Sequence, residues 1–395
     1  MKVIEGKNVP IKSWCNEPEE GAVDQAKNLA SLPFIFKQVC LMPDTHQGYG
    51  MPIGGVIATK GVVIPNAVGV DIGCGMCAVR TDFDAKLLTP ELIKQIFGGS
   101  KKYHGGIRSA VPVGFNHRSK GIDWDGFDNA PDIDIVQQQL GSARKQLGTL
   151  GGGNHFIELQ ACTDGHLWFM VHSGSRNVGY QIAKYYNKLA QELCRKWYSN
   201  IPPLKGEDGL AFLPLDTDEG QEYLDAMNFA LDFAHQNRLV MLREISKAVY
   251  DVLGCNFDPE INIHHNYARM ENHFGSNVMV HRKGATSAKT GEFGIIPGSQ
   301  GTSSYIVVGK GNPESFMSCS HGAGRKMSRT KAKNVLSLDD EIASMDKQGI
   351  VHSIRHKNDL DEASGAYKDI GVVMDEQKDL VDVMVELKPL GVIKG

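Results

Sequence analysis

The chain has 395 residues, of which 41% are hydrophobic and 22% are charged, an ordinary composition for a globular protein. No apolar run reaches the length of a membrane span, and the first residues carry no apolar signal-peptide core, so we predict a cytoplasmic protein without a membrane segment. The formal net charge of −4 argues against a protein that coats nucleic acid non-specifically, but it leaves room for a local basic site.

The first half of the chain alternates between helical and strand-like patterns. The clearest helix begins at Thr89-Pro90-Glu91, where Pro stands in the first turn, and it ends at Gly98-Gly99. The other expected elements are a helix over 20–40 interrupted by Pro33, strands over 50–83, a polar loop over 100–130, a helix over 135–150, and a buried strand over 166–176 that runs into a turn.

The second half begins with apolar residues at helical spacing. The expected elements are helices over 177–200 and 219–254, short strands over 260–310, a Gly-rich turn and helix after His321, and a last strand over 380–395. No repeat or linker divides the chain, and polar motifs follow strands along its whole length. We therefore predict one α+β domain, 1–395, whose site gathers residues from distant segments.

The stretch VGVDIGCGMCAVRTDF, residues 68–83, carries Asp71 and Cys74 in an apolar, Gly-rich setting. A buried Asp is costly without a partner, and a metal ion would be one. Cys74 and Cys77 form a CxxC, but no second pair follows at zinc-ribbon spacing, and the run continues as a strand rather than opening a thioredoxin-type helix. The eight cysteines are expected to be reduced, and most of them to be buried apolar groups.

The histidines supply candidates for the missing ligands. Seven lie in polar or unremarkable contexts, where a surface or structural role is expected, namely His104, His117, His166, His235, His273, His352 and His356. The other seven lie beside Gly, Asn, Ser or Arg, mostly at strand ends: His46, His155, His172, His264, His265, His281 and His321. With Asp71 and Cys74 they offer more donors than one tetrahedral ion needs, so the pattern favours two ions that share the thiolate.

Gly-rich turns accompany these histidines. The segments GGGNH, PGSQGTSS and HGAGR leave backbone N–H groups open, an arrangement that binds phosphates. Cations stand beside the same turns, at Arg176, Arg282, Lys283, Arg325 and Arg329. The combination predicts metal-dependent chemistry on phosphates.

The chain resembles the RtcB family of RNA-splicing ligases, through MPDTHQGYG, VGVDIGCGM, GTLGGGNHFIE, VHSGSR, HHN, VHRKGAT, IPGSQGTSSY, SCSHGAGRKMSR, AYKDI and the terminal GVIKG. The resemblance covers nearly the whole chain. It implies an RtcB-like fold, with mixed sheets flanked by helices and a central metal and nucleotide cleft. It also implies an enzyme that uses GTP and manganese to join an RNA 3′-phosphate or 2′,3′-cyclic phosphate end to a 5′-hydroxyl end.

The same resemblance implies a role for each metal-site residue. Asp71, Cys74 and His155 would hold one Mn²⁺ ion, and Cys74, His172 and His265 would hold a second. His265 is preferred to His264 because the family ligand directly precedes an Asn, here Asn266. His321 would be the nucleophile that carries GMP.

A longer set would form the guanylate pocket. Within it Lys394 would donate to guanine O6 and Glu158 would accept from the guanine N1–H and N2–H₂ groups, while Gln300 stands where the family commonly has Met. Arg176, Arg325 and Arg329 would bind phosphates, with Asp44 and His46 nearby. The pocket set is Asn154, His155, Phe156, Ile157, Glu158, His265, Asn266, Pro297, Gly298, Ser299, Gln300, Ser304, His321, Gly322, Ala323, Gly324, Tyr367 and Lys394.

Two other functions use the same residues. A binuclear metallophosphoesterase acting on RNA ends would need the ions but neither GTP nor a His321 adduct. A non-catalytic protein that binds RNA ends around a structural metal would show no turnover. The sequence does not choose between split tRNA halves and damaged RNA as substrate, and it leaves open the need for an archease-type activator; a monomer is the default expectation.

Overall fold

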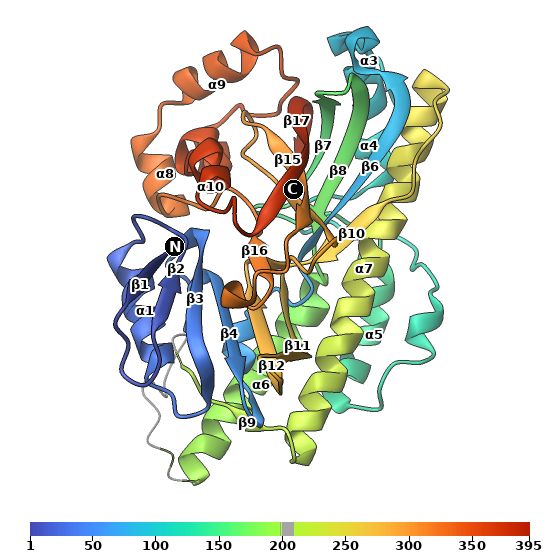
Figure 1. Cartoon of the computed structure of the whole chain (residues 1–395). Coiled ribbons are helices and arrows are strands. Elements are labelled where there is room, and N and C mark those ends of the chain that lie inside the picture. Colours follow the sequence, from blue (N-terminus) through green and yellow to red (C-terminus); the bar gives the residue numbers. More distant parts are fainter. Residues whose placement is uncertain (198, 200–208) are drawn as a thin grey trace.

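A computed structural model describes residues 1–197, 199 and 209–395 (Figure 1). Its first large sheet has six strands and is antiparallel except where β2 pairs with β3. In sheet order these are β1 (Lys2–Ile4), β2 (Ile11–Ser13), β3 (Ile35–His46), β4 (Ile53–Thr59), β12 (Ser276–Lys283) and β11 (Asn266–His273).

The second large sheet is antiparallel throughout and has seven strands. Their order is β10 (Ile261–His264), β6 (Gly75–Asp84), β8 (His166–Ser173), β7 (Phe156–Cys162), β17 (Val381–Lys394), β15 (Ser304–Gly309) and β14 (Phe293–Ile296). Two small ribbons complete the described pairing: β13 (Ala285–Ser287) with β16 (Ser318–Ser320), and β5 (Val62–Val63) with β9 (Leu213–Pro214).

Helices cover both sheets, and the long α7 packs across β6, β8 and β10 of the second one (Figure 1). The α+β class expected from the sequence is therefore confirmed. The α-helices are α1 (Glu20–Ala30), α2 (Pro65–Val68), α3 (Pro90–Phe97), α4 (Ile107–Ala110), α5 (Asp134–Gln146), α6 (Arg176–Lys196), α7 (Asp218–Leu253), α8 (Arg329–Val335), α9 (Leu338–Lys347) and α10 (Ile370–Asp375). Within the described part of the chain, no helix combines the length and apolar character needed to cross a bilayer.

Two helices begin as the sequence predicts. The Thr89 hydroxyl accepts from Leu92 N (3.3 Å) at the start of α3, and Pro90 occupies the first turn. Thr217 caps α7 in the same way, and Gly254 ends that helix in the left-handed conformation at φ 64°. The helix expected over 177–200 is α6, which ends at Lys196; residues 198 and 200 lie outside the described residues.

The helix expected over 20–40 is wrong in its second half. The helix α1 ends at Ala30, before Pro33, and the chain then forms β3 from Ile35. The run IFKQVCLM is buried along most of its length. A short apolar run of this kind has no period that separates a buried strand from a buried helix, so the sequence pattern alone misassigned it.

The ends of the strands bring distant segments together. His46 ends β3, His172 is near the end of β8, and His155 directly precedes β7. His265 is the single residue between β10 of the second sheet and β11 of the first, so the chain crosses between the sheets at this histidine. The candidate site therefore lies where the two large sheets meet.

Arg282 and His281 do not belong to that site, contrary to expectation. Arg282 is fully buried on β12, where it forms a two-pronged ion pair with Glu271 (2.6 and 3.2 Å). The His273 ring adds a third contact to Glu271 (3.0 Å). His281 is also fully buried, and its Nε2 accepts from Ile64 N (3.0 Å). Successive side chains of a strand point to opposite faces, and both faces of β12 are buried, with Met279 in one apolar cluster and Val280 in another. A position near a Gly-rich turn therefore did not place either side chain in the cleft.

Glu271→Gln is expected to destabilise the fold by about 3 kcal/mol, because it leaves the Arg282 guanidinium buried without its counter-charge. Burial opposes the charge on Glu271, but His273 and Arg282 hold the pKa of this carboxyl well below its usual range. The stability from the pair is thus fully present above the ordinary glutamate pKa of 4.5, and it is lost progressively as the pH falls from there through the lowered pKa of the folded protein. Urea unfolding at pH 7 and pH 3 measures both effects.

The matched control is Lys289→Ala. The Lys289 ammonium lies 3.9 Å from the same carboxylate, but its side chain is 46% exposed. Its removal is expected to cost less than about 1 kcal/mol. Equal losses in the two variants would contradict the assignment of the buried pair.

Candidate active site

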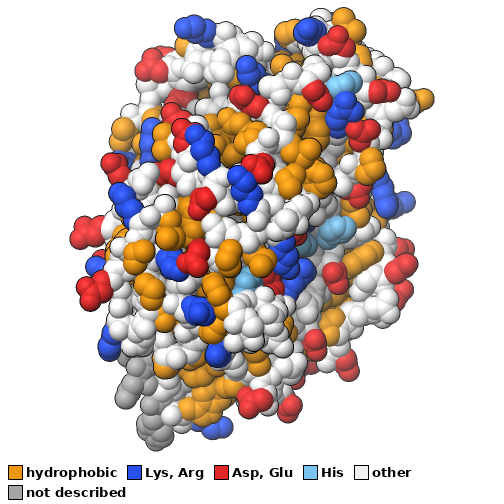
Figure 2. Space-filling view, in the orientation of Figure 1, with side chains coloured by type: hydrophobic (Ala, Val, Ile, Leu, Met, Phe, Trp, Pro, Cys, Tyr) orange, Lys and Arg blue, Asp and Glu red, His pale blue; other side chains and the backbone are white. Residues whose placement is uncertain are grey.

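A cavity of about 790 Å³ opens between the two large sheets. Its lining begins at Glu19 and ends at Lys394, so it collects residues from almost the whole chain. In the space-filling view, imidazole atoms and cationic side chains lie close together near the middle of the visible face (Figure 2). Figure 1 shows the C-terminus near the centre of the fold.

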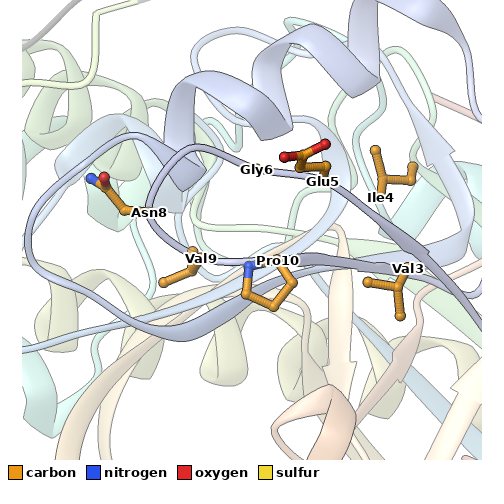
Figure 3. Close-up of a pocket in the computed structure, with 7 residues that line it drawn as sticks. All are labelled: Val3, Ile4, Glu5, Gly6, Asn8, Val9 and Pro10. Carbon is orange, nitrogen blue, oxygen red and sulfur yellow. The ribbon is translucent and has the colours of Figure 1, made fainter.

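A second hollow, of about 460 Å³, lies at the loop between β1 and β2 (Figure 3). Its lining comes from one stretch of chain between Val3 and Pro10, and Glu5 is the only ionisable side chain in it. This hollow has none of the histidine, cysteine or arginine residues that distinguish the larger cavity. We therefore place the candidate site in the larger one.

The centre of the site is the Cys74 thiol. Its Sγ lies 3.4 Å from His155 Nε2 and 3.3 Å from His172 Nε2. His155 Nε2 is 3.2 Å from Asp71 Oδ2, and His172 Nε2 is 3.3 Å from His265 Nε2. The donor atoms form two groups, each within 4.8 Å, and Cys74 is common to both: Asp71, Cys74 and His155 in one, and Cys74, His172 and His265 in the other.

Backbone carbonyls orient two of the imidazoles. His155 Nδ1 donates to Leu150 O (2.9 Å), and His172 Nδ1 donates to Asn154 O (3.1 Å). Because a carbonyl only accepts, each Nδ1 carries the proton and each Nε2 lone pair faces Cys74. Oriented imidazoles around a thiol and a carboxylate form a donor set that fits divalent transition metals.

Burial sets the charge of these donors. It lowers the pKa of His172 and His265 well below the ordinary value, which keeps both rings neutral and able to act as ligands. Burial raises the pKa of the Cys74 thiol, and coordination to a metal would remove its proton. Asp71 is different: burial opposes its charge, but its contacts with His155 and Cys74 and the nearby charge of Arg176 hold its pKa below the usual range.

His321 lies beside this cluster, with its ring centroid 4.8 Å from that of His265. Its Nδ1 lies 2.6 Å from Asp44 Oδ2, and the same oxygen accepts from His321 N (3.1 Å). Asp44 is fully buried, and its Oδ1 has no hydrogen-bond partner among the described residues. His46 Nδ1 donates to Asp44 O (2.9 Å), and burial lowers the pKa of His46 to about 4.

The structure brings nearly the whole predicted guanylate pocket to one cavity. Ile157 is the exception: it is fully buried in the apolar core between β7, β8 and α7, away from the cavity. The cause is the two-residue period of β7, which sends Phe156 and Glu158 to one face and Ile157 to the other. His155 lies beneath the cavity lining, in the Cys74 cluster. The predicted pocket residues that line the cavity are Asn154, Phe156, Glu158, His265, Asn266, Pro297, Gly298, Ser299, Gln300, Ser304, His321, Gly322, Ala323, Gly324, Tyr367 and Lys394.

Glu158 and Lys394 reach the cavity from adjacent strands. The pairing of β17 with β7 sets Lys394 opposite Phe156, and the Lys394 ammonium lies 5.6 Å from the centre of the Phe156 ring. Burial raises the pKa of Glu158 to about 8, against the opposing effects of Gln160 and Lys394. Burial also lowers the pKa of Lys394. Such paired shifts are common in functional sites.

Glu362 is a cavity residue that the sequence analysis missed. Its buried carboxylate accepts from Arg329 Nε (2.7 Å) and lies 3.1 Å from Arg325 Nη1, and the Tyr367 hydroxyl donates to it. The segment around Glu362 carries no Gly-rich or strand-end signal, so only the fold reveals that it anchors the two arginines.

Arg176 takes a different position from Arg325 and Arg329. It lies against the Gly-rich turn, where a Cβ on Gly151 would be only 2.1 Å from its Nη1. Its Nε donates to Thr149 Oγ1 (3.3 Å), on the side of the Cys74 cluster. Gly151 is therefore needed for the close approach of a cation, and its φ of 95° suits glycine.

Comparisons with known proteins identify the family of this chain. The family model described as tRNA-splicing ligase RtcB matches residues 25–395. The chain is 40% identical to the RNA-splicing ligase RtcB of Escherichia coli K12, over 100% of this chain and 99% of that protein. It is 33% identical to tRNA-splicing ligases RtcB of Nanoarchaeum equitans, over 99% and 96% of the two chains, and of Thermococcus kodakarensis, over 95% and 92%.

Proposed function

We propose that this chain, which belongs to the RtcB family of RNA-splicing ligases, joins RNA 3′-phosphate or 2′,3′-cyclic phosphate ends to 5′-hydroxyl ends with GTP as co-substrate. Residues 1–395 would act as one domain, in tRNA splicing or RNA repair, as a monomer. The observation that carries the proposal is the His321 imidazole, held by Asp44 and set 4.8 Å from the ring of a histidine in the Cys74 cluster.

In the first step His321 would attack GTP. Its Nδ1–H is donated to Asp44, so the lone pair on Nε2 is free. That pair forms a P–N bond to the α-phosphorus of GTP, the P–O bond to the β-phosphate breaks, and pyrophosphate leaves. Asp44 orients the ring and stabilises the positive charge that the imidazole gains when it forms the P–N bond.

The metal set fits two Mn²⁺ ions, held by Asp71, Cys74 and His155 and by Cys74, His172 and His265. When bound, such ions neutralise charge that builds on the phosphoryl oxygens. The chain itself keeps the His172 and His265 imidazoles neutral by burial, and backbone carbonyls orient His155 and His172. It also excludes water, since Cys74 and the three histidines are each 4% exposed or less.

Two transfers would complete the reaction. The guanylate moves from His321 to the RNA 3′-phosphate: the P–N bond breaks and a P–O–P anhydride forms. The 5′-hydroxyl then attacks the RNA phosphorus, loses its proton, and expels GMP as the phosphodiester forms; a 2′,3′-cyclic end would first be opened by water. Arg176, Arg325 and Arg329 would bind the phosphates during these transfers.

Guanine selection would rest on Glu158 and Lys394. A lysine ammonium donates to guanine O6 and a glutamate carboxylate accepts from the N1–H and N2–H₂ groups, whereas adenine reverses this pattern. The donors of a bound guanine would favour the ionised form of Glu158 against the effect of burial. A site built from such hydrogen bonds discriminates strongly, because the wrong base leaves buried polar groups without partners. Both side chains line the same cavity as Tyr367 and Arg325.

Lys394→Met is expected to lower adduct formation with GTP about 10- to 100-fold and to narrow the preference for GTP over ATP. Both effects are expected because the variant loses one hydrogen bond from a charged donor. Methionine keeps an unbranched side chain on the strand but removes the ammonium group, and with it the contact to the Phe156 ring. The measurement is adduct yield with each α-labelled nucleotide. The control is Lys388→Met, on the exposed side of the same strand, which should guanylylate at the wild-type rate. Equal rates in both variants would remove Lys394 from the site.

One assay separates the three candidate functions. The full chain is incubated with α-labelled GTP and Mn²⁺, and then with RNA that carries a 3′-phosphate end and a 5′-hydroxyl end. The ligase becomes covalently labelled and joins the ends. A binuclear phosphoesterase releases phosphate without becoming labelled, and a non-catalytic RNA-end-binding protein does neither. Joining by the chain alone would also show that no archease-type activator is required.

A further inference from the structure

The middle of α7 holds a buried positive charge that pairs with no carboxylate in the described chain. Arg238 is fully buried, and its hydrogen-bond partners are neutral. Nη1 donates to Gly73 O (3.0 Å) and Ser173 O (2.9 Å), and Nε donates to Asn262 Oδ1 (2.7 Å). Nη2 lies 3.2 Å from His264 Nδ1. Burying a charge without a counter-charge costs free energy, so fold stability alone does not explain an arginine here.

Three of the four partners of Arg238 share one property: each adjoins a residue of the Cys74 cluster. Gly73 precedes Cys74, Ser173 follows His172, and His264 precedes His265. One guanidinium therefore joins the three chain segments that carry the Cys74, His172 and His265 group. Its donors lie in a fixed planar fork, which sets the relative positions of these segments more rigidly than separate hydrogen bonds would.

Asn237, the residue before Arg238, is linked by hydrogen bonds to the segment that carries His155, the remaining histidine of the Cys74 cluster. Its Oδ1 accepts from Gly148 N (2.7 Å), and its Nδ2 donates to Thr149 O (3.1 Å) and Ser173 Oγ (3.2 Å). Ser173 Oγ in turn donates to Leu150 O (2.7 Å), the same carbonyl that orients His155. Asn237 is also fully buried, so these bonds do not compete with water.

Two glycines let the ligand loop rest directly on this part of α7. A Cβ on Gly75 would lie 2.9 Å from Arg238 Nη1 and 2.0 Å from Ile263 O. Gly73 has φ 74°, and a Cβ there would lie 2.9 Å from the Ala234 methyl. The Gly-rich character of the Asp71–Cys74 segment is thus explained in part by its contact with α7.

We propose that Asn237 and Arg238 are positioning residues that hold the Cys74, His155, His172 and His265 segments in metal-binding geometry before any ion arrives. The inference rests on the proposed function, because it assumes that this cluster binds metal. Neither side chain contacts the cavity. They act through backbone carbonyls, backbone N–H groups and the side chains of Ser173 and His264, as outer-shell groups do in other metal sites.

The test is a titration of the full chain with Co²⁺ alone, followed by the thiolate-to-cobalt charge-transfer absorption. Asn237→Asp keeps the side-chain size but turns a carboxylate oxygen toward Thr149 O and Gly174 O. Arg238→Met removes the fork, and Arg238→Lys keeps the charge without it. We expect Asn237→Asp and Arg238→Met to bind Co²⁺ about 10- to 100-fold more weakly than the wild type, with a weaker absorption band. We expect Arg238→Lys to restore only part of the lost affinity.

The matched control is Arg243→Met, five positions along the same helix and exposed, which should bind Co²⁺ as the wild type does. Circular dichroism identifies folded variants, and if Arg238→Met does not fold, Asn237→Asp decides the question. If the folded variants bind Co²⁺ with an affinity within about threefold of the wild type and show the same absorption band, the inference is overturned and the proposed metal centre stands. Loss of an outer-shell group normally lowers the metal affinity by more than that. A wild-type chain without the band would overturn the proposed metal centre and the inference with it.

Discussion

Replacing His321 with alanine is expected to abolish the covalent guanylate while metal binding persists. The ring is the only imidazole in the described cavity that is held by a buried carboxylate, through the 2.6 Å contact with Asp44. His321 belongs to neither group of clustered donor atoms, so its loss should not release the ions. The measurement is protein-bound label after incubation with α-labelled GTP and Mn²⁺, with the Co²⁺ absorption band as the readout of the intact metal site.

Two comparisons make this result specific. His117→Ala removes an exposed imidazole and should retain the full adduct yield. Asp44→Asn should retain His321 but slow its guanylylation, because the neutral amide no longer stabilises the ring as it becomes charged. Label that stays attached to purified His321→Ala would place the nucleophile on another residue.

The strand-end motifs predicted which distant residues lie together, because they mark where the chain turns at the edge of a sheet. Such turns need glycines and expose backbone N–H groups, and polar side chains beside them lie in the same space. This is why Asp71, His155 and His321, far apart in sequence, could be placed in one site before their positions were known. The choice of His265 over His264 came from the family resemblance; in the structure His265 belongs to the cluster, while His264 lies near Gly73 O and Arg238.

What the sequence could not supply is the direction of each side chain and the contacts made across the fold. His281 and Arg282 have the same local signals as true cavity residues, yet both point into the core. Asn237 and Arg238 lie in a helix with an ordinary amphipathic pattern, so nothing local marks them as neighbours of Cys74. The misplacement of His281 and Arg282 and the failure to detect Asn237 and Arg238 have one origin. A single sequence records spacing along the chain but not which element packs against which.

The C-terminal strand also shows that the sequence does not reveal which strands pair. Its strand-like pattern was evident, but its length and register were not: β17 pairs with β15 on one side and β7 on the other, with irregularities in both pairings. This register puts Lys394 opposite Phe156 and lets Gly395 N donate to His155 O (3.1 Å). The end of the chain is thereby fixed against the segment that leads into the metal cluster, where an unpaired terminus would be frayed.

Cys74→Ala is expected to lower ligation at least about 100-fold and to leave fewer bound Mn²⁺ ions than the wild type. The thiol is the one donor common to both groups, so its removal takes a ligand from each proposed ion, whereas His172→Ala takes a ligand from one. Loss of a direct ligand should exceed the 10- to 100-fold effects typical of outer-shell changes. The measurements are the ligation rate and the Mn²⁺ content of the purified protein.

Cys77→Ala is the matched control, three residues further along the same segment. Cys77 is also fully buried, and burial raises the pKa of its thiol to about 12, but it packs in the apolar core on the other face of β6. It should therefore lose a little stability, about 1 kcal/mol for a small buried group, and keep both its ions and its activity. If both alanine variants ligate at the wild-type rate, Cys74 is a structural cysteine like its neighbour, and the shared-thiolate centre is wrong.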